Sequence, residues 1–175
     1  MTSKYFAFFM VMMTCLAAGC GGITDAEEQS PWLNREAELL EHNRQKITIE
    51  EGLSGTMLRR EGDCMRGPGP GESTCILYPV PKRIKIFEYT HISQTSREIG
   101  QYYTRVDTKL IATVQSDGEG FFQIPLPAGT YSVFPVSEDG RYIVTGADGQ
   151  GGLNPLVAEE GEVPHYRLIH NRAAF

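Results

Sequence analysis

Hydrophobic and polar residues alternate with a period of two over much of the chain after residue 46. This alternation is typical of β-strands that bury one face. Strands are expected at residues 55–60, 76–80, 83–89, 109–115, 121–126, 130–136, 141–145, 153–158 and 163–169. Glycine-containing turns, several with an acidic residue before the glycine, separate most of these segments. Short strands joined by such turns predict an all-β sandwich.

The alternation also predicts which strand residues face the interior. The expected inward-facing side chains are Ile84, Ile86, Leu110, Ala112, Val114, Phe122, Ile124, Leu126, Tyr131 and Val133. Residues 90–108 show the least regular pattern, and a short helix is expected within this insertion at 96–103. Long insertions on a rigid scaffold often carry binding sites.

A helix is expected before the first strand, over residues 31–45. Ser30 suits the N-cap, and Pro31 suits the first helical position, where a missing N–H breaks no intrahelical bond. The helix would carry a narrow apolar stripe made of Leu33, Ala37 and Leu40. A stripe this narrow predicts that the helix either packs lightly on the domain or frays.

The first residues have the pattern of an export signal. Lys4 precedes an apolar segment at 5–16, which is shorter than the roughly 20 residues that a membrane span needs. Small residues at 17–19 followed by Cys20 resemble the lipobox of bacterial lipoproteins. The resemblance implies cleavage before Cys20, lipid on its sulfur and lasting membrane attachment. Gly21 rather than Asp follows the cysteine, which in the enterobacterial lipoprotein sorting scheme argues against retention in the inner membrane. The outer membrane of the cell envelope is therefore the expected location. An ordinary secretory signal with a chance cysteine is the alternative.

Two cysteines remain once the signal is removed and Cys20 is lipidated. Cys64 and Cys75 flank a turn-prone segment, MRGPGPGEST, in a protein expected in an oxidising compartment. We expect a structural disulfide between them. A zinc pair is the first alternative, but two thiols do not complete a zinc site. A redox pair is the second, but it usually has the shorter C-x-x-C spacing.

A distinctive set of turn and strand residues lies in the region from Asp117 to Phe134 and just before it. The set comprises Thr113, Ser116-Asp117-Gly118, Gly120-Phe121, Leu126-Pro127, Gly129-Thr130-Tyr131 and Val133. It resembles the carboxypeptidase regulatory-like domain. That family has a transthyretin-like (prealbumin-like) Greek-key sandwich of about seven strands, whose members usually act in stability, adhesion or recognition. The resemblance therefore implies a Greek-key sandwich over residues 47–175 with a non-catalytic role.

This organisation divides the chain into three parts: a signal peptide at 1–19, a tether with a short helix at 20–46, and the sandwich domain at 47–175. The formal net charge of −6 disfavours a general nucleic-acid binder. The membrane, reached through Cys20, and an unknown protein or glycan are the expected partners.

Candidate catalytic and metal-binding residues are sparse. His165 and His170 are the nearest histidine pair, and their spacing of five places them on opposite faces of one strand. The acid-glycine turns lack the spacing of a calcium-binding EF-hand loop. The sequence contains no G-x-S-x-G nucleophile motif. We therefore expect no catalytic residues, no metal and no cofactor.

A recognition surface is expected in the long insertion. Tyr102, Tyr103 and Arg105 combine aromatic and guanidinium groups, which make effective contact anchors. A local basic patch is expected from Arg59, Arg60, Lys82, Arg83 and Lys85. The sequence thus favours a lipid-anchored, non-catalytic protein that binds or scaffolds a partner. A carbohydrate-binding module that uses the two tyrosines is the alternative, and an envelope hydrolase is a further one.

Overall fold

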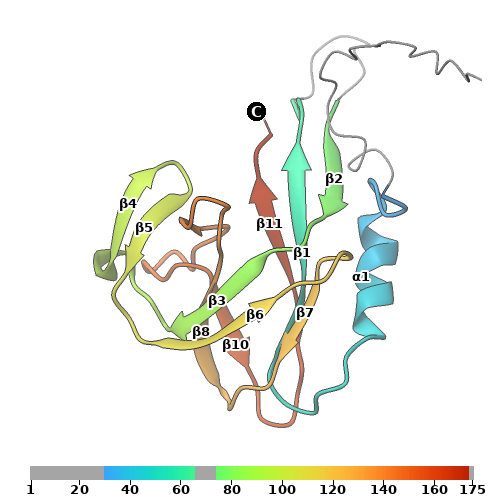
Figure 1. Cartoon of the computed structure of the whole chain (residues 1–175). Helices are drawn as coiled ribbons and strands as arrows, with labels where there is room; N and C mark the ends of the chain where they lie inside the picture. Colours follow the sequence, from blue (N-terminus) through green and yellow to red (C-terminus); the bar gives the residue numbers. More distant parts are fainter. Residues whose placement is uncertain (1–29, 66–73, 174–175) are drawn as a thin grey trace, which may run out of the picture.

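The computed structural model describes residues 30–65 and 74–173. The predicted signal peptide, Cys20 and the start of the tether lie outside the described residues. The elements in chain order are α1 (Glu36–Arg44), β1 (Leu53–Glu61), β2 (Ile76–Pro79), β3 (Arg83–Glu88), the 3-10 turn η1 (Ile92–Gln94), β4 (Thr95–Ile99), β5 (Tyr102–Val106), β6 (Leu110–Gln115), β7 (Phe121–Ile124), β8 (Gly129–Pro135), β9 (Tyr142–Ile143), β10 (Pro155–Ala158) and β11 (His165–Asn171). The predicted all-β sandwich with one short helix is confirmed (Figure 1).

Strand β1 is the centre of the first sheet. One of its edges pairs in parallel with β11, so that Ser54 lies opposite His165 and Arg59 lies opposite His170. Its other edge is shared by two antiparallel strands: β7 pairs with the first half of β1, and β2 pairs with the second half. The first and last strands of the domain are thus neighbours, which joins its two ends in one sheet (Figure 1).

The second sheet has the order β10-β8-β3-β6, and all of its strands are antiparallel. The main core lies between the two sheets. It is formed by Leu53, Met57, Tyr78, Val80, Ile84, Ile86, Phe122, Leu126, Tyr131, Val133, Ala158 and Leu168. Most of the inward-facing residues predicted from alternation belong to this core or pack against it. Leu110 does not, because it lies on the edge strand β6, where the ladder with β3 shifts register, and it is 45% exposed.

A third, smaller sheet has the order β4-β5-β9. It covers the outer face of the second sheet, and a second apolar cluster of Phe87, Tyr103, Phe134 and Leu153 fills the space between them. The helix expected at 96–103 is therefore wrong: β4 and β5 form a hairpin that turns at Gly100, whose φ is +57°. Tyr103 is buried between the half-buried Tyr102 and the exposed Thr104, as expected where neighbouring strand residues point to opposite faces. The hairpin lies on the side of the molecule away from α1 (Figure 1).

Helix α1 starts later than the sequence predicts. Residues 31–34 form turns, and Asn34 adopts a left-handed φ of 56°, which a helix cannot accommodate. The backbone N–H of Asn34 donates to the Leu77 carbonyl, and its side chain accepts from the Leu77 N–H. Pairing with the exposed edge of β2 thus replaces the first predicted helical turn.

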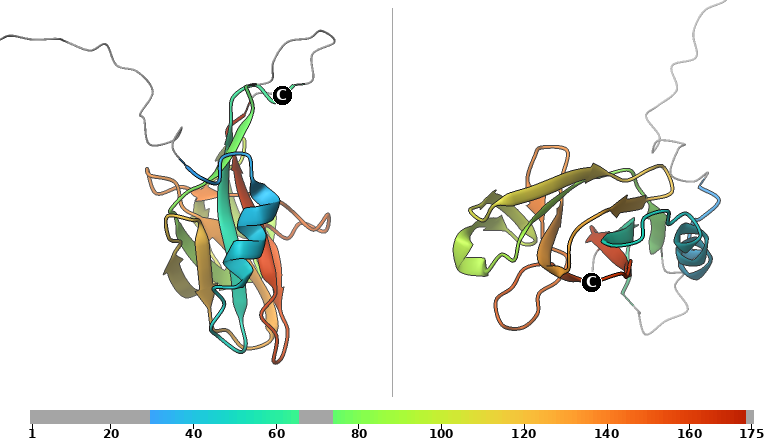
Figure 2. Two further views of the ribbon diagram at one scale, coloured as in Figure 1. Left: turned by 90° about the vertical axis from the view of Figure 1, so that its right-hand side faces the viewer. Right: turned by 90° about the horizontal axis from the view of Figure 1, so that it is seen from below.

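The helix lies along the outer face of the first sheet (Figure 2, left). Its fully buried residues are Leu39 and Asn43, rather than the predicted stripe. Asn43 donates from its amide to the Thr56 hydroxyl at 2.9 Å and to the Glu119 carbonyl at 3.0 Å. The helix therefore contacts β1 through one apolar and one polar residue, and β1 is buried on both faces over its first six positions.

The turn between β6 and β7 fixes the position of the helix. The Glu119 carboxylate accepts from Trp32 Nε1 at 3.0 Å, lies 3.0 Å from His42 Nε2 and accepts from Lys46 Nζ at 3.2 Å. Burial opposes ionisation of this carboxyl, but these three hydrogen bonds outweigh it, and the pKa of Glu119 is lowered. The acid-glycine turn is thus a structural anchor for residues 32–46.

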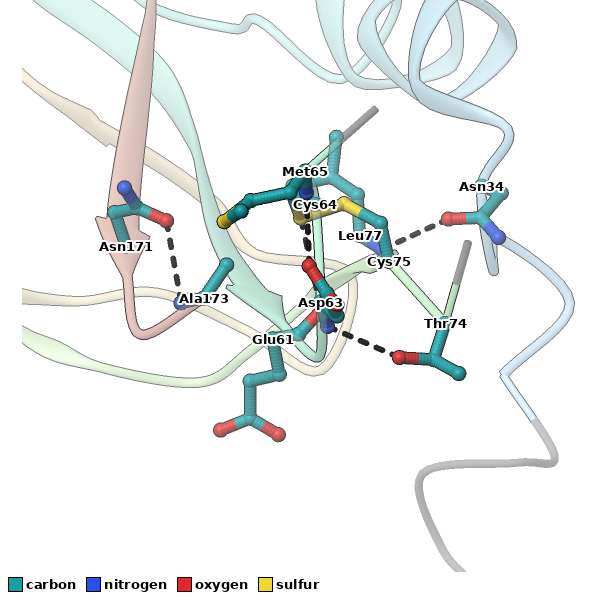
Figure 3. The surroundings of a disulfide bond; sticks show 10 residues. All are labelled: Asn34, Glu61, Asp63, Cys64, Met65, Thr74, Cys75, Leu77, Asn171 and Ala173. Atoms are coloured by element: carbon teal, nitrogen blue, oxygen red, sulfur yellow. Dashed lines mark hydrogen bonds between the residues drawn. A yellow bond between two sulfur atoms is a disulfide. The ribbon is translucent and has the colours of Figure 1, made fainter. Parts of the chain in front are cut away.

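The predicted disulfide between Cys64 and Cys75 is confirmed (Figure 3). The two cysteines follow β1 and precede β2, with a Cα–Cα distance of 4.7 Å. The Asp63 N–H donates to the Thr74 hydroxyl beside them at 3.0 Å. The bond therefore joins the chain just after β1 to the chain just before β2.

Candidate functional site

A cavity of about 220 Å³ lies where the end of β1, the end of β11 and the β8–β9 turn meet. We call it the cation pocket. Its lining residues are Arg59, Lys82, Tyr102, Ser137, Glu138, Asp139, Arg141, His170 and Arg172. Four of these side chains are cationic and two are acidic, although the whole chain carries a net negative charge.

Lys82 is the most deeply buried charge of the pocket. The residue is only 5% exposed. Its backbone is held at the start of β3, since its N–H donates to the Ser116 hydroxyl at 2.7 Å and its carbonyl accepts the Ser116 N–H at 2.9 Å. Its ammonium donates to Glu138 Oε1 at 3.2 Å, which is the only acceptor it has among the described residues. An ammonium group carries three N–H donors, so two remain available inside the cavity.

Glu138 provides the negative charge opposite Lys82. The same Oε1 atom also accepts from Arg59 Nη2 at 3.2 Å. The Lys82 hydrogen bond, with the charge of Arg59 beside it, lowers the pKa of Glu138. The side chains of the two cations are 6% and 13% exposed, whereas that of Glu138 is 82% exposed. A solvent-exposed carboxylate therefore bridges two buried cations.

Two more cations flank this bridge. Arg172 contacts Glu61 at 3.4 Å, and Glu61 also lies 3.9 Å from Arg59. On the opposite side, the Arg141 guanidinium lies 4.4 Å above the Tyr102 ring and contacts Glu98 at 3.2 Å. The pocket thus lies between positively charged groups from β1, β11 and the β8–β9 turn.

His170 closes the inner side of the pocket. It is 3% exposed, and its Nε2 lies 3.0 Å from the Tyr102 hydroxyl. Its Nδ1 has no hydrogen-bond partner among the described residues. Burial lowers the pKa of His170 to about 4, and the nearby charges of Lys82 and Arg59 act in the same direction. The imidazole is therefore neutral near pH 7.

The structure separates the three residues of the predicted recognition surface. Tyr103 is 4% exposed and belongs to the second core, so its predicted place on a surface is wrong. Its burial follows from the hairpin, since neighbouring strand residues point to opposite faces. Arg105 is exposed and contacts Asp107 at 3.1 Å. Tyr102 alone reaches the cation pocket, where its ring lies beneath Arg141.

The predicted basic patch is also divided. Arg59 and Lys82 line the cation pocket, whereas Arg60 lines a second cavity of about 260 Å³. Lys85 lies above the Tyr142 ring at 5.2 Å. Sequence reasoning did not select Glu138, Arg141, Arg172 or His170 for the site. No short motif joins these residues, because they come together only through the pairing of β1 with β11 and the return of the chain after β8.

His165 and His170 lie in different surroundings. His165 stacks on Phe121 and bonds to Ser54 and Thr56, far along β11 from the Tyr102 contact of His170. Within residues 30–65 and 74–173, no group of three His, Cys, Asp or Glu side chains is placed to hold a metal ion. The same described residues include no helix long and apolar enough to cross a membrane.

Comparison of the chain with protein-family models, with curated proteins and with solved structures found no match. The fold and the pocket define the class of the protein as an all-β sandwich with a surface cavity lined by four cationic side chains.

Lowering the pH from 7 to 5 is expected to destabilise the protein, at pH values higher than those at which carboxylates usually titrate. An unfolded histidine titrates near pH 6.5, whereas His170 in the folded state titrates near 4. Between these values the unfolded state binds more protons, so stability is complete above pH 6.5 and is lost as the pH falls toward 4. His170 should contribute about 2 kcal/mol of the loss between pH 7 and pH 5.

Urea unfolding of the wild type and of His170→Gln at both pH values measures this contribution. His165, whose pKa burial also lowers to about 4, should retain its own share in the variant. An unchanged difference between the two pH values in His170→Gln would contradict the assignment to His170.

Proposed function

We propose that this protein is a lipid-anchored, non-catalytic binding protein of the cell envelope, whose β-sandwich presents the cation pocket to an acidic group of a partner. The observation that carries the binding site is Lys82: a lysine residue 5% exposed, in a cavity, whose ammonium has one acceptor among the described residues. Burying a charge is unfavourable unless it is compensated. A site that retains such a charge beside three arginines is suited to an anionic group.

The hydrogen bonds of the pocket favour binding over catalysis. Ser137 Oγ donates to the Asp139 carboxylate and to the Arg141 carbonyl, while His170 Nε2 meets the Tyr102 hydroxyl. The only serine hydroxyl and the only imidazole of the lining thus have separate partners. Nucleophilic catalysis requires a nucleophile and a base in direct contact.

An acidic partner is also preferred to a neutral sugar. Sugar-binding platforms would need exposed aromatic faces, but Tyr103 is buried and the Tyr102 ring is covered by Arg141. The resemblance of residues 117–134 to the carboxypeptidase regulatory-like domain supports a recognition role, because members of that family usually act beside a partner. The outer membrane is the proposed location, on the basis of the lipobox at Cys20.

Photo-crosslinking in the producing cells tests the site. A benzoylphenylalanine at Ser137, in the pocket lining, should yield defined adducts, and the same group at the exposed turn residue Glu160 should not. Equal adduct patterns from both positions, or none from Ser137, would exclude the pocket as the binding surface.

The anchor is tested separately. Cys20→Ala is expected to move the protein from the membrane fraction to the soluble fraction or to leave it unprocessed, because the acylated sulfur is lost. Fractionation and labelling with a radioactive fatty acid measure both effects, with Cys64→Ser/Cys75→Ser as the matched control that keeps Cys20. Label in Cys20→Ala at the wild-type level would contradict lipidation at this residue.

A further inference from the structure

We propose that the cation pocket binds a phosphate-type oxyanion, and that Glu138 occupies the position of this ligand until the ligand displaces it. The inference rests on the proposed binding function and deepens it by naming the chemistry of the ligand. Four observations carry it: the unequal exposure of Glu138 and its partners, the free donors of the site, its charge balance and the rigidity of the surrounding turn.

Glu138 has the features of a replaceable counter-ion. One of its oxygen atoms receives both Lys82 Nζ and Arg59 Nη2, each at 3.2 Å. Its own side chain is 82% exposed, so rotation into water meets no packing resistance. The two cations are nearly buried and cannot follow it. A carboxylate that leaves would expose two fixed cations to any anion of suitable size.

The turn that carries Glu138 is fixed independently of that side chain. Ser137 and Arg141 are joined by a backbone hydrogen bond of 2.8 Å, and the Gly140 N–H donates to the Ser137 carbonyl at 3.0 Å. Asp139 accepts from Arg141 Nε at 2.9 Å. Release of the Glu138 side chain therefore leaves the backbone of the pocket in place.

Donors for a ligand are already present in the cavity. Lys82 retains two ammonium protons without a protein acceptor among the described residues. His170 Nδ1 also has no partner among the described residues, but this atom is fully buried, so the cations supply the donors for the ligand. A tetrahedral oxyanion offers several acceptor oxygens to these donors, whereas a single carboxylate oxygen from Glu138 engages only two.

The charge balance leaves the site positive once Glu138 is displaced. The lining has the four cations Arg59, Lys82, Arg141 and Arg172. With Glu138 removed, the carboxylates of the site are Asp139 in the lining, Glu61 beside Arg59 and Arg172, and Glu98 beside Arg141. Four positive charges and three negative charges leave one positive charge, which favours an anion over a neutral ligand.

Removing the internal competitor should strengthen phosphate binding. Calorimetric titration of the full chain in mild detergent with inorganic phosphate, at about pH 8 and constant ionic strength, measures the dissociation constant. Glu138→Gln is expected to bind roughly 10-fold more tightly than the wild type, because Gln keeps the shape without the charge. Glu160→Gln removes the same charge from the exposed β10–β11 turn and should match the wild type.

Removing the cations should have the opposite effect. Lys82→Met is expected to weaken phosphate binding at least 10-fold. Because Lys82 is buried, its replacement could also disturb the fold, so Arg172→Gln serves as a second variant. The Arg172 side chain is 50% exposed, and its loss should weaken binding about 3-fold while the fold remains intact. The proton NMR signal of the His170 imidazole should shift on phosphate addition in the wild type.

The source of the phosphate group is distinguished by the number of its free oxygens. Glycerol 1-phosphate, a monoester with three free oxygens, should bind at least 10-fold more tightly than dimethyl phosphate, a diester of the kind found in lipid headgroups, which has two. Equal binding of the two would overturn the preference for a monoester and favour a headgroup. Equal phosphate affinity of Glu138→Gln and wild type, or an unmoved His170 signal, would overturn the proposal itself. If the Ser137 position gives crosslinked adducts but the protein does not bind phosphate, the proposed binding function is supported and only phosphate is excluded as its ligand.

Discussion

Phe134→Ala is expected to lower the free energy of unfolding by about 4 kcal/mol. Phe134 is fully buried at the centre of the second apolar cluster. Its ring meets Phe87 edge-on at 5.8 Å and Tyr142 at 5.9 Å. Truncation removes these contacts and leaves a cavity that the sheets on both sides cannot close.

The same substitution should affect the cation pocket. The second cluster holds the β4-β5-β9 sheet against β3 and β8, and β5 carries Tyr102 beside the pocket. Amide hydrogen exchange should therefore accelerate in β5 and β9 beyond the change expected from global unfolding.

Urea unfolding at pH 7 measures the stability change. Phe134→Leu is the graded control, because it leaves a smaller cavity and should lose less than half as much. Val157→Ala, on the edge strand β10 at 45% exposure, should change stability by less than about 0.5 kcal/mol. A loss below about 1 kcal/mol in Phe134→Ala would contradict the role of this cluster.

Cys64→Ser/Cys75→Ser is expected to lower the free energy of unfolding by about 3 kcal/mol. The bond closes a segment with a sequence separation of 11, and the loop-closure model assigns the loss to the greater freedom of the unfolded chain. Its position at the end of the β1–β2 hairpin means that few other contacts replace it (Figure 3).

Chemical unfolding with and without a reductant separates the bond from the side chains. The wild type in reductant should fall to the stability of the double variant, while the variant itself should not respond to reductant. Met65→Ala, next to the bridge and 55% exposed, is the matched control and should be neutral. A double variant as stable as the oxidised wild type would show that the disulfide does not contribute.

Strand positions were largely predictable because their signal is local. Ile84 and Ile86 alternate with charged residues in β3, and both are fully buried. The disulfide was predictable because the expected export signal leaves only two cysteines, Cys64 and Cys75, for a bond in an oxidising compartment. The hairpin at β4 and β5 was missed because Ser96–Tyr103 has no strong period of its own, and only burial of Tyr103 against Phe134 decides its structure.

The candidate site was only partly predictable. Arg59 and Lys82 were named as basic residues, but a sequence does not show that a lysine will be buried. Glu138 looked like an ordinary turn residue, and His170 looked like a strand residue without a partner. Their roles depend on contacts 56 residues apart for Lys82 and Glu138, and 68 apart for Tyr102 and His170.

The β-sandwich class, most strand positions and the cysteine pair follow from local sequence, because hydrophobic periodicity and turn chemistry act over a few residues. The parallel pairing of β1 with β11, the packing of a third sheet on the second, and the gathering of four cations in one pocket appear only in the folded chain. Those features arise from long-range pairing, in which residues far apart in the chain determine one another's burial and charge environment.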